Sequence, residues 1–473
     1  MTMKIFLHRS QFCRGSLLNL RSRLVFTSLT LFLVLISFLS SESSPLTAAG
    51  LFSTLEKNME KKGEELPFLP NEFPQPGLDG VVNIVLPNSR IRSLTLVGEL
   101  QKGLQQFIMN NGNPIASVVI VDAKTGQILA MAQGRTPKLW DSKVHTALYS
   151  GFPAASLFKL VTTTAALQVA QLDPDEELSL HGGCSDVHPR GLWLADFYAP
   201  TYNAGPLTTL TRSGSSRKHK ATRPYSNRGQ KMTLSRAFAS SCNGFYAELV
   251  VKRLGLGMVS KFAEKFAWGR KIPSDFAISE SPIYTPTAES SNIHTVGMFA
   301  AGFGMVGMSA VHAAWLTLMI ANDGRSMPLK IFSDTVDSAK NPFLLNVETE
   351  PLFDKQTGLK LRHMMNGTVR SGTARGAFSK RGYRGLVDLV GGKTGTLNGE
   401  APKGQTTWFT GLSPIDDPQI IVSSIVVNDS KWVIKGSQLA AEAFKLWYQY
   451  NAAKKINNSL HSENVAPIKS TKG

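Results

Sequence analysis

The chain contains 473 residues, of which 42% are hydrophobic, so it is long enough to bury a large core. Its formal net charge is +17, and its three cysteines are too few for a disulfide framework. Nine histidines are scattered without the spacing of metal ligands, so we expect no metal and no cofactor. These features exclude a small disulfide-rich scaffold, whereas the length alone allows one to three domains.

The N-terminal region carries a membrane-targeting pattern. Residues 24–41 contain no charge and follow five basic residues, Lys4, Arg9, Arg14, Arg21 and Arg23. This uncharged run is short for a membrane helix and long for a signal-peptide core. Because residues 41–49 offer a poor cleavage site, we favour an uncleaved single-pass signal anchor over a cleaved signal peptide or a buried core helix. Residues 1–23 would then be cytoplasmic, 42–89 would form a short stalk, and the rest would lie outside the inner (cytoplasmic) membrane.

The first motif that carries chemistry is Ser156-Leu-Phe-Lys159. It opens a run, residues 157–170, that is apolar on nearly every face, which predicts a buried helix. Residues three apart lie on one face of a helix, so the Lys159 amine is expected beside the Ser156 hydroxyl. The spacing therefore places a base next to a nucleophile.

Two further motifs follow, Ser241-Cys-Asn243 and Lys393-Thr-Gly395-Thr396. The motif at Lys393 lies in the first of three strand-like runs, and the other two runs are 406–412 and 419–427. The sequence Leu397-Asn-Gly399 predicts a hairpin turn after the first run. A glycine weakens a strand and is tolerated where another backbone must come close. Gly395 therefore indicates a strand along which a peptide can pair.

Similar short patterns elsewhere in the chain are poor candidates for a catalytic site. Ser215 lies three residues before Lys218, but in a stretch rich in Gly, Ser, Lys and Arg that has no apolar period, so nothing would fix the lysine beside the serine. Lys124-Thr-Gly126 lies between the strand-like runs 117–121 and 128–131, so it predicts a hairpin turn.

The three motifs together suit acyl transfer through a serine ester. A serine hydroxyl needs a base to take its proton, and a lysine can be that base only when it is neutral. A free lysine has a pKa of about 10.4. Burial and the nearby charge of Lys393 would lower the pKa of Lys159.

The remaining groups can complete the reaction. Ser241 can pass a proton towards a leaving amine, and the Asn243 amide can hold both Lys159 and a substrate carbonyl. The backbone N–H groups of Ser156 and Thr396 are the expected donors to an oxyanion.

The order of these motifs resembles the transpeptidase domain of penicillin-binding proteins, a family whose relatives include the serine β-lactamases. Other matching landmarks are residues 117–130, 240–245, 302–305, 320–324, 371–374 and 391–396. The resemblance implies a transpeptidase domain over residues 90–453, catalytic roles for Ser156, Lys159, Ser241, Asn243 and Lys393, and substrate binding by Thr394, Gly395 and Thr396.

The resemblance also implies the reaction of a peptidoglycan D,D-transpeptidase. Ser156 would attack the penultimate D-alanine carbonyl of a stem peptide, release the terminal D-alanine, and pass the acyl group to an amine of a neighbouring stem. Lys393, Thr394 and Thr396 would bind the terminal carboxylate. β-Lactams resemble the same dipeptide, so they would acylate Ser156, and other cell-wall synthesis proteins are expected partners.

Two alternatives stay open at this point. In a D,D-carboxypeptidase or a β-lactamase, water takes the acyl group; a β-lactamase needs a base for that water, and Glu289-Ser-Ser-Asn292 does not match the Glu-x-x-Leu-Asn setting of that base. A penicillin-recognising sensor or a scaffold is the non-enzymatic alternative, but a cytoplasmic segment of residues 1–23 leaves little room for a signalling output.

The chain departs from the family pattern in two ways. Ala154 and Ala155 stand where the family commonly has proline and glycine, a change that we expect to alter only the loop. The segment 42–89 is too short for a pedestal module, and no paired-acid motif of a glycosyltransferase is found.

A basic run without an acid lies between Gly205 and Ser235 and contains Arg212, Arg217, Lys218, Lys220, Arg223, Arg228 and Lys231. We interpret it as a solvated insertion, with weak attraction to anionic wall polymer or lipid headgroups as the functional alternative. No nucleic-acid partner is expected, because a single tyrosine supplies the aromatic content of the run. Cys13 falls on the cytoplasmic side, which leaves Cys184 and Cys242 either to pair or to stay reduced.

The expected fold is α+β, an antiparallel five-stranded sheet built from the N-terminal hairpin and the three C-terminal strands. A long helix over residues 437–453 covers one face, and a mostly helical lobe carries Ser156 and Ser241. Trp408 and Phe409 are expected in the core, and residues 454–473 form a flexible tail.

Overall fold

The computed structural model of the chain describes residues 66–77, 80–86, 89–135, 144–180, 183–184, 187, 230–287, 293–334, 350–400, 402–429 and 432–464. The predicted anchor, residues 24–41, and most of the basic run between 205 and 235 lie outside these residues. In the described part of the chain, no helix has both the length and the apolar character needed to cross a membrane.

The principal helices and strands follow one another along the chain in this order: β1 Asn83–Val85, β2 Ile91–Ser93, α3 Gly98–Asn110, β3 Ile115–Asp122, β4 Ile128–Gly134, the 3₁₀ turn η2 Ala155–Phe158, α4 Lys159–Gln168, β5 Glu177–Leu180, β6 Gln230–Thr233, α6 Leu234–Ser240, α7 Asn243–Leu249, α8 Leu256–Lys265, α9 Ile293–Ala300, α10 Ala310–Ala321, α11 Lys355–Arg370, α12 Arg375–Phe378, β7 Gly391–Glu400, β8 Lys403–Ser413, β9 Ile420–Asn428 and α13 Gly436–Asn464.

A five-stranded antiparallel sheet of order β4-β3-β9-β8-β7 lies at the centre of the fold. The N-terminal hairpin joins the C-terminal strands because β3 pairs with β9 along its whole length, from Ile115 opposite Val427 to Asp122 opposite Ile420. The predicted α+β fold is therefore confirmed. Strand β7, which carries the third motif, is an edge strand of this sheet and pairs with β8 alone.

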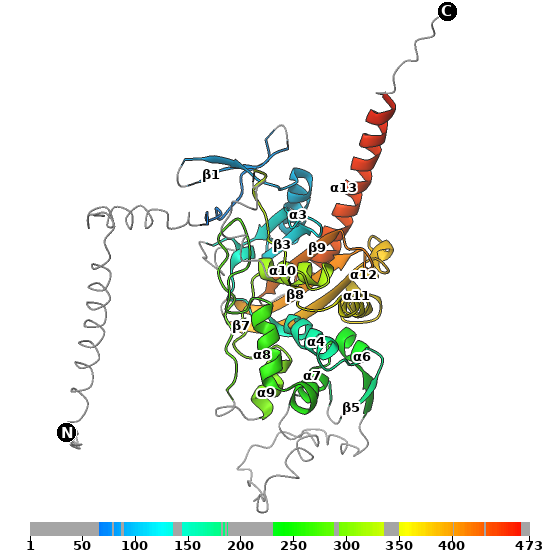
Figure 1. The fold of residues 1–473 in the computed structure, drawn as a ribbon. Helices are drawn as coiled ribbons and strands as arrows, with labels where there is room; N and C mark the ends of the chain where they lie inside the picture. The colour runs from blue at the N-terminus through cyan, green and yellow to red at the C-terminus, as the bar shows by residue number, and fades with distance from the viewer. Residues whose placement is uncertain are drawn as a thin grey trace, which may run out of the picture. The chain divides into compact units, whose positions relative to one another are not determined.

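Both faces of the sheet are covered. On β3, Val118 and Ile120 belong to the cluster that contains buried residues of α3 and α13, while Val119 and Val121 belong to the cluster that contains α10. Because successive side chains point to opposite faces and both faces are buried, β3 is apolar from Ile115 to Val121 except at Ser117. Helix α10 is buried along its entire length, which explains why it is apolar all round. In Figure 1, α4, α6, α7, α8 and α9 gather into a lobe on one side of the sheet.

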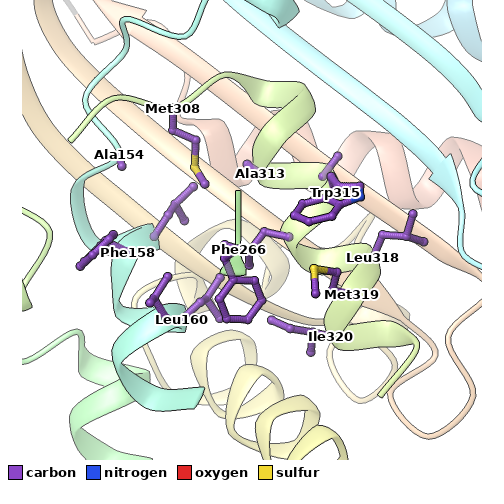
Figure 2. Packing of buried hydrophobic residues seen from close by; sticks show 14 of the residues in the cluster. Ala154, Phe158, Leu160, Phe266, Met308, Ala313, Trp315, Leu318, Met319 and Ile320 are labelled. Atoms are coloured by element: carbon purple, nitrogen blue, oxygen red, sulfur yellow. The ribbon is translucent and has the colours of Figure 1, made fainter. Parts of the chain in front are cut away.

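The start of helix α4, which follows Ser156, packs onto the core of the protein. Figure 2 shows Leu160 on the side of Phe266 and Phe158 projecting to the other side of the ribbon; both residues, which flank Lys159, belong to the same buried cluster as α10. The Phe158 ring also makes edge contacts with Trp268 and Phe299, at centroid distances of 5.2 and 5.0 Å. This apolar packing holds the start of α4 in place.

Three boundaries differ from the expectations from sequence. The Asn398-Gly399 pair does not form a turn, because β7 continues to Glu400 with Asn398 opposite Gln405 and Gly399 opposite Gly404. Helix α13 continues to Asn464, whereas the sequence predicted that it ends at residue 453 and that a flexible tail follows. The helix continues because Ala452 and Ala453 favour helix and no proline or glycine follows them within it.

The third difference concerns the expected stalk over residues 42–89. The compact unit of the chain already begins at Leu66. Val82, Ile84 and Leu86 are buried in the same cluster as the nucleophile helix. The described residues between 66 and 89 therefore belong to this compact unit, because their apolar side chains are part of its core.

Candidate active site

The first motif forms a tight turn at the start of the nucleophile helix. Residues 155–158 are a 3₁₀ turn, and the α-helix begins at Lys159 rather than at Ser156. A 3₁₀ turn has three residues per turn, so side chains at positions i and i+3 lie directly in line. Lys159 Nζ accordingly lies 3.0 Å from Ser156 Oγ. The predicted contact between the Lys159 amine and the Ser156 hydroxyl is present in the structure.

The residue before the nucleophile is in an unusual backbone conformation. Ala155 has φ 49°, in the left-handed region that glycine occupies at no cost. For alanine this conformation costs about 1 kcal/mol. The expectation that the two alanines alter only the loop is thus incomplete, because Ala155 places backbone strain directly beside Ser156.

Gly302 lies in close contact with the strained turn at Ala155. A Cβ atom on Gly302 would lie 2.0 Å from the carbonyl oxygen of Ala155, and Gly302 itself has φ 86°. Gly304, two residues further along, has φ 90° but open space around its Cα. Both glycines therefore have a positive φ, but of the two only Gly302 lies against the turn that carries Ser156.

Replacing Gly302 by alanine is expected to destabilise the protein by about 3 kcal/mol and to slow acylation by penicillin, because a clash with a backbone atom can be relieved only by moving the turn. Gly304→Ala is the matched control and is expected to cost about 1 kcal/mol, from its positive φ alone. Urea unfolding and the rate of penicillin labelling are the two measurements. If both variants lost the same amount of stability and of labelling rate, the close approach of Gly302 to Ala155 would contribute nothing to either.

The second motif provides two partners for Lys159. Ser241 caps the C-terminus of α6 with φ 57°, and Asn243 begins α7. Lys159 Nζ lies 3.1 Å from Ser241 Oγ and 2.9 Å from the carbonyl oxygen of Ser241, and it donates a hydrogen bond to Asn243 Oδ1. The side chains of Ser241 and Asn243 thus surround the same amine that contacts Ser156.

The third motif brings a second lysine to Ser241. Lys393 is fully buried, and its Nζ donates to Ser241 Oγ at 2.9 Å and to the carbonyl oxygen of Thr394 at 3.0 Å. A Cβ atom on Gly395 would meet Trp408 and, at 3.4 Å, the carbonyl oxygen of Ala154. Strand β7 therefore passes close to the nucleophile turn, and the absence of a side chain at Gly395 permits this approach.

Trp408 joins the sheet to the nucleophile loop. Its ring is buried, and its Nε1–H donates to the carbonyl oxygen of Pro153 at 2.8 Å. Phe409, the next residue, points to the opposite face and packs on Phe378 and Phe444. The predicted core positions of Trp408 and Phe409 are confirmed, and Trp408 also fixes the distance between β8 and the turn that carries Ser156.

The two threonines of the third motif lie on the outer side of β7. Thr394 is half-buried and its hydroxyl is hydrogen-bonded to the hydroxyl of Thr373, whereas Thr396 is exposed. Thr373 belongs to the 371–374 landmark, and its own N–H donates to the carbonyl oxygen of Ala239 at 3.1 Å. Residue 373 therefore links the end of α6 to β7.

Burial changes the charge state of both lysines. Desolvation, and then the positive charge of Lys393, hold the pKa of Lys159 well below its usual value. Desolvation also lowers the pKa of Lys393, to about 7. Burial therefore favours the neutral amine of Lys159 beside Ser156 more than in a free lysine, while Lys393 retains a share of its proton at neutral pH.

Of the five candidate catalytic residues, Ser156, Ser241 and Asn243 line one cleft of about 360 Å³, whereas Lys159 and Lys393 are fully buried and are not part of its lining. Its lining consists of Ser156, Ser241, Asn243, Phe303, Thr373, Thr394, Gly395, Thr396, Thr407, Trp408, Lys435 and Ser437. No carboxylate is among these residues, and Lys435 is the one charged side chain of this lining. Sequence reasoning did not assign roles to Phe303, Thr373, Lys435 or Ser437; the first two lie in the landmarks 302–305 and 371–374, and no local pattern marked the last two.

Cys184 and Cys242 form a disulfide. The question that the sequence left open is thus answered in favour of pairing, and the alternative of a buried free thiol is wrong. The pairing was not visible in the sequence because 58 residues separate the two cysteines.

Comparison with known proteins agrees with the geometry. The family model described as the penicillin binding protein transpeptidase domain matches residues 116–189 and 200–449, well over half of the chain. The chain belongs to this family. Among curated relatives, penicillin-binding protein PbpB of Mycolicibacterium smegmatis is 24% identical over 70% of this chain and 49% of its own length. Peptidoglycan D,D-transpeptidase PbpA of the same organism is 24% identical over 70% of this chain and 66% of its own length.

Solved structures of the family have the same fold. The D,D-transpeptidase domain from Eggerthella lenta aligns with a TM-score of 0.54 at 20% identity, over 79% of this chain and 96% of that chain. Penicillin-binding protein A of Mycobacterium tuberculosis, as a ceftriaxone acyl-enzyme complex, aligns with a TM-score of 0.52 at 21% identity, over 75% and 78%. The family and its fold are therefore established, while the chain spans about half to two thirds of the length of the curated relatives named above.

Proposed function

We propose that this penicillin-binding protein domain is a peptidoglycan D,D-transpeptidase that forms an acyl-enzyme on Ser156. The observation that carries this proposal is the contact of 3.0 Å between Ser156 Oγ and a fully buried lysine amine whose pKa is lowered. The name of the relative PbpA, peptidoglycan D,D-transpeptidase, and the acyl-enzyme complex of the M. tuberculosis protein support the same reaction.

The proton follows a short route in this mechanism. Neutral Lys159 takes the proton of Ser156 as its oxygen attacks the penultimate D-alanine carbonyl. Ser241, which lies within 3.1 Å of both lysine amines, gives its proton to the leaving D-alanine nitrogen and receives the proton held by Lys159, so that Lys159 is neutral again. Asn243 holds Lys159 in position through its Oδ1 atom and turns its amide N–H groups to the substrate.

The substrate lies along the outer edge of β7. Its terminal carboxylate is bound by Lys393, Thr394 and Thr396, a cation and two hydroxyls that suit an anion. The peptide pairs with the backbone at Gly395, and the N–H groups of Ser156 and Thr396 stabilise the oxyanion. An amine of a neighbouring stem then takes the acyl group and completes the cross-link.

The location follows from the N-terminal pattern and the disulfide. We propose that residues 24–41 anchor the chain in the inner membrane, with 1–23 in the cytoplasm and the catalytic unit outside. Disulfides persist in oxidising compartments, and the Cys184–Cys242 bridge lies within the catalytic unit. Other cell-wall synthesis proteins are expected partners in that compartment.

Labelling with a fluorescent penicillin tests the proposal. The wild-type chain is expected to form a covalent adduct that persists for hours, and Ser156→Ala is expected to form none while keeping the same unfolding transition. Rapid loss of the adduct with release of hydrolysed penicillin would instead identify a β-lactamase. A folded wild-type chain without any label would defeat the proposal.

A further inference from the structure

The disulfide lies inside the catalytic motif rather than at the edge of the fold. Cys242 stands between Ser241 and Asn243 and is buried. Its partner, Cys184, follows strand β5, which lies beside α7 in the lobe (Figure 1). The disulfide therefore links the segment after β5 to Cys242, the residue between Ser241 and Asn243, which both contact Lys159.

Cys184 also supplies what the start of α7 lacks. The first N–H groups of a helix have no partner within the helix and usually receive a capping side chain. At α7 the N-cap residue is Cys242, whose side chain makes no capping hydrogen bond. Instead, the carbonyl oxygen of Cys184 accepts hydrogen bonds from Asn243 N–H at 2.8 Å and Gly244 N–H at 3.3 Å. The first turn of α7 is thus capped by the backbone of the residue to which it is covalently bound.

The two partners of Lys159 are held by different means. Ser241 N–H donates to the carbonyl oxygen of Phe238, and Cys242 N–H to that of Ala237, so α6 itself fixes Ser241. The N–H of Asn243 is directed to Cys184, on the other side of the disulfide. Loss of the bond is therefore expected to release Asn243 more than Ser241.

We propose that the Cys184–Cys242 disulfide is a positioning element of the active site, which sets Asn243 against Lys159 and makes the rate of Ser156 acylation depend on the redox state of the chain. This inference rests on the proposed function. A dithiol reductant would convert the bridge into two thiols, taking up two electrons and two protons as the reductant becomes a cyclic disulfide. The carbonyl of Cys184 then loses its covalent tether to α7, and Asn243 loses its fixed position.

The extent of the effect is limited by a second attachment. Beyond Cys184, Val187 packs on Ala247 of α7, and its carbonyl oxygen is hydrogen-bonded to His294 Nδ1 at 2.6 Å. The reduced segment therefore stays near α7. A displacement of about 1 Å at a catalytic group can cost up to about 100-fold in rate, so we expect reduction to slow acylation about tenfold.

The test compares the oxidised and the dithiothreitol-reduced full chain in a Cys13→Ser background, which removes the remaining thiol. The expected result is a tenfold lower rate of penicillin acylation after reduction, at a pH and temperature at which both forms are folded. The variant Cys184→Ala/Cys242→Ala is expected to be slow with or without reductant. Cys184→Ala/Cys242→Ser restores a capping oxygen at the start of α7 and is expected to recover part of the rate.

A bridge that only stabilises the fold predicts something different. Reduction would then lower the urea midpoint but leave the acylation rate of the folded chain and its pH profile unchanged, and that result would overturn the inference. An outcome in which the oxidised wild type takes no label would instead reject the proposed function itself. The two failures are therefore distinguishable.

Discussion

Replacing Lys159 by methionine is expected to slow the acylation of Ser156 by penicillin about 10³-fold. Lys159 Nζ lies 3.0 Å from Ser156 Oγ, and burial lowers its pKa, which favours the neutral amine that can accept the proton of the attacking hydroxyl. Methionine has a similar length and no basic atom, so the site loses its base without gaining a cavity. The time course of fluorescent penicillin labelling measures the rate.

The fold is expected to survive this substitution. Lys159 is buried among apolar residues of the nucleophile helix, and an apolar side chain removes the cost of desolvating its amine. The free energy of unfolding should therefore be unchanged or higher. Lys380→Met, at an exposed position after α12, controls for the loss of one lysine and is expected to label at the wild-type rate. Normal labelling of Lys159→Met would show that another group is the base.

The rate of acylation is expected to have a bell-shaped pH dependence. As the pH falls through the lowered pKa of Lys159, the amine takes up a proton and can no longer accept one from Ser156. As the pH rises through about 7, Lys393 loses the proton that attracts the substrate carboxylate. In kcat/KM for a D-Ala-D-Ala peptide the alkaline limb should therefore lie near 7. In kcat it should lie higher, because a bound carboxylate stabilises the charged form of Lys393.

Lys393→Met separates the two limbs. The variant should lose the alkaline limb and raise the midpoint of the acid limb, because the positive charge that helps to lower the pKa of Lys159 is gone. Its KM for the peptide should rise, since the carboxylate has lost its cation. An unchanged acid limb would mean that desolvation alone sets the pKa of Lys159. An unchanged alkaline limb would assign that limb to a different group.

The sequence was sufficient to predict the parts of the site that depend on local spacing. Ser156 and Lys159 are one helical turn apart, so their contact follows from helix geometry alone. The sheet was predictable because its strands alternate with clear turns, such as Lys124-Thr-Gly126, where Gly126 has φ 73°. The meeting of these segments with Ser241 in one cleft was inferred from the family resemblance, since no local rule brings residues so far apart in the sequence together.

Features set by tertiary contacts were not predictable. The Asn398-Gly399 pair has the composition of a turn, but pairing with Gln405 and Gly404 keeps it within the strand. Thr373 and Lys435 line the cleft because of where α11 ends and where α13 begins; Thr373 lies in the landmark 371–374 but no role was predicted for it, and no local pattern marks Lys435. The disulfide required knowledge that β5 lies against α7. In each case the deciding partner is remote in the sequence.

The measurement that tests the central claim most directly is the location of the penicillin adduct by mass spectrometry of proteolytic fragments. The account predicts a mass increase of one intact penicillin on the fragment that contains Ser156, and on no other fragment. An adduct on the fragment that contains Ser241, or none on a chain shown to be folded, would contradict the assignment of Ser156 as the nucleophile.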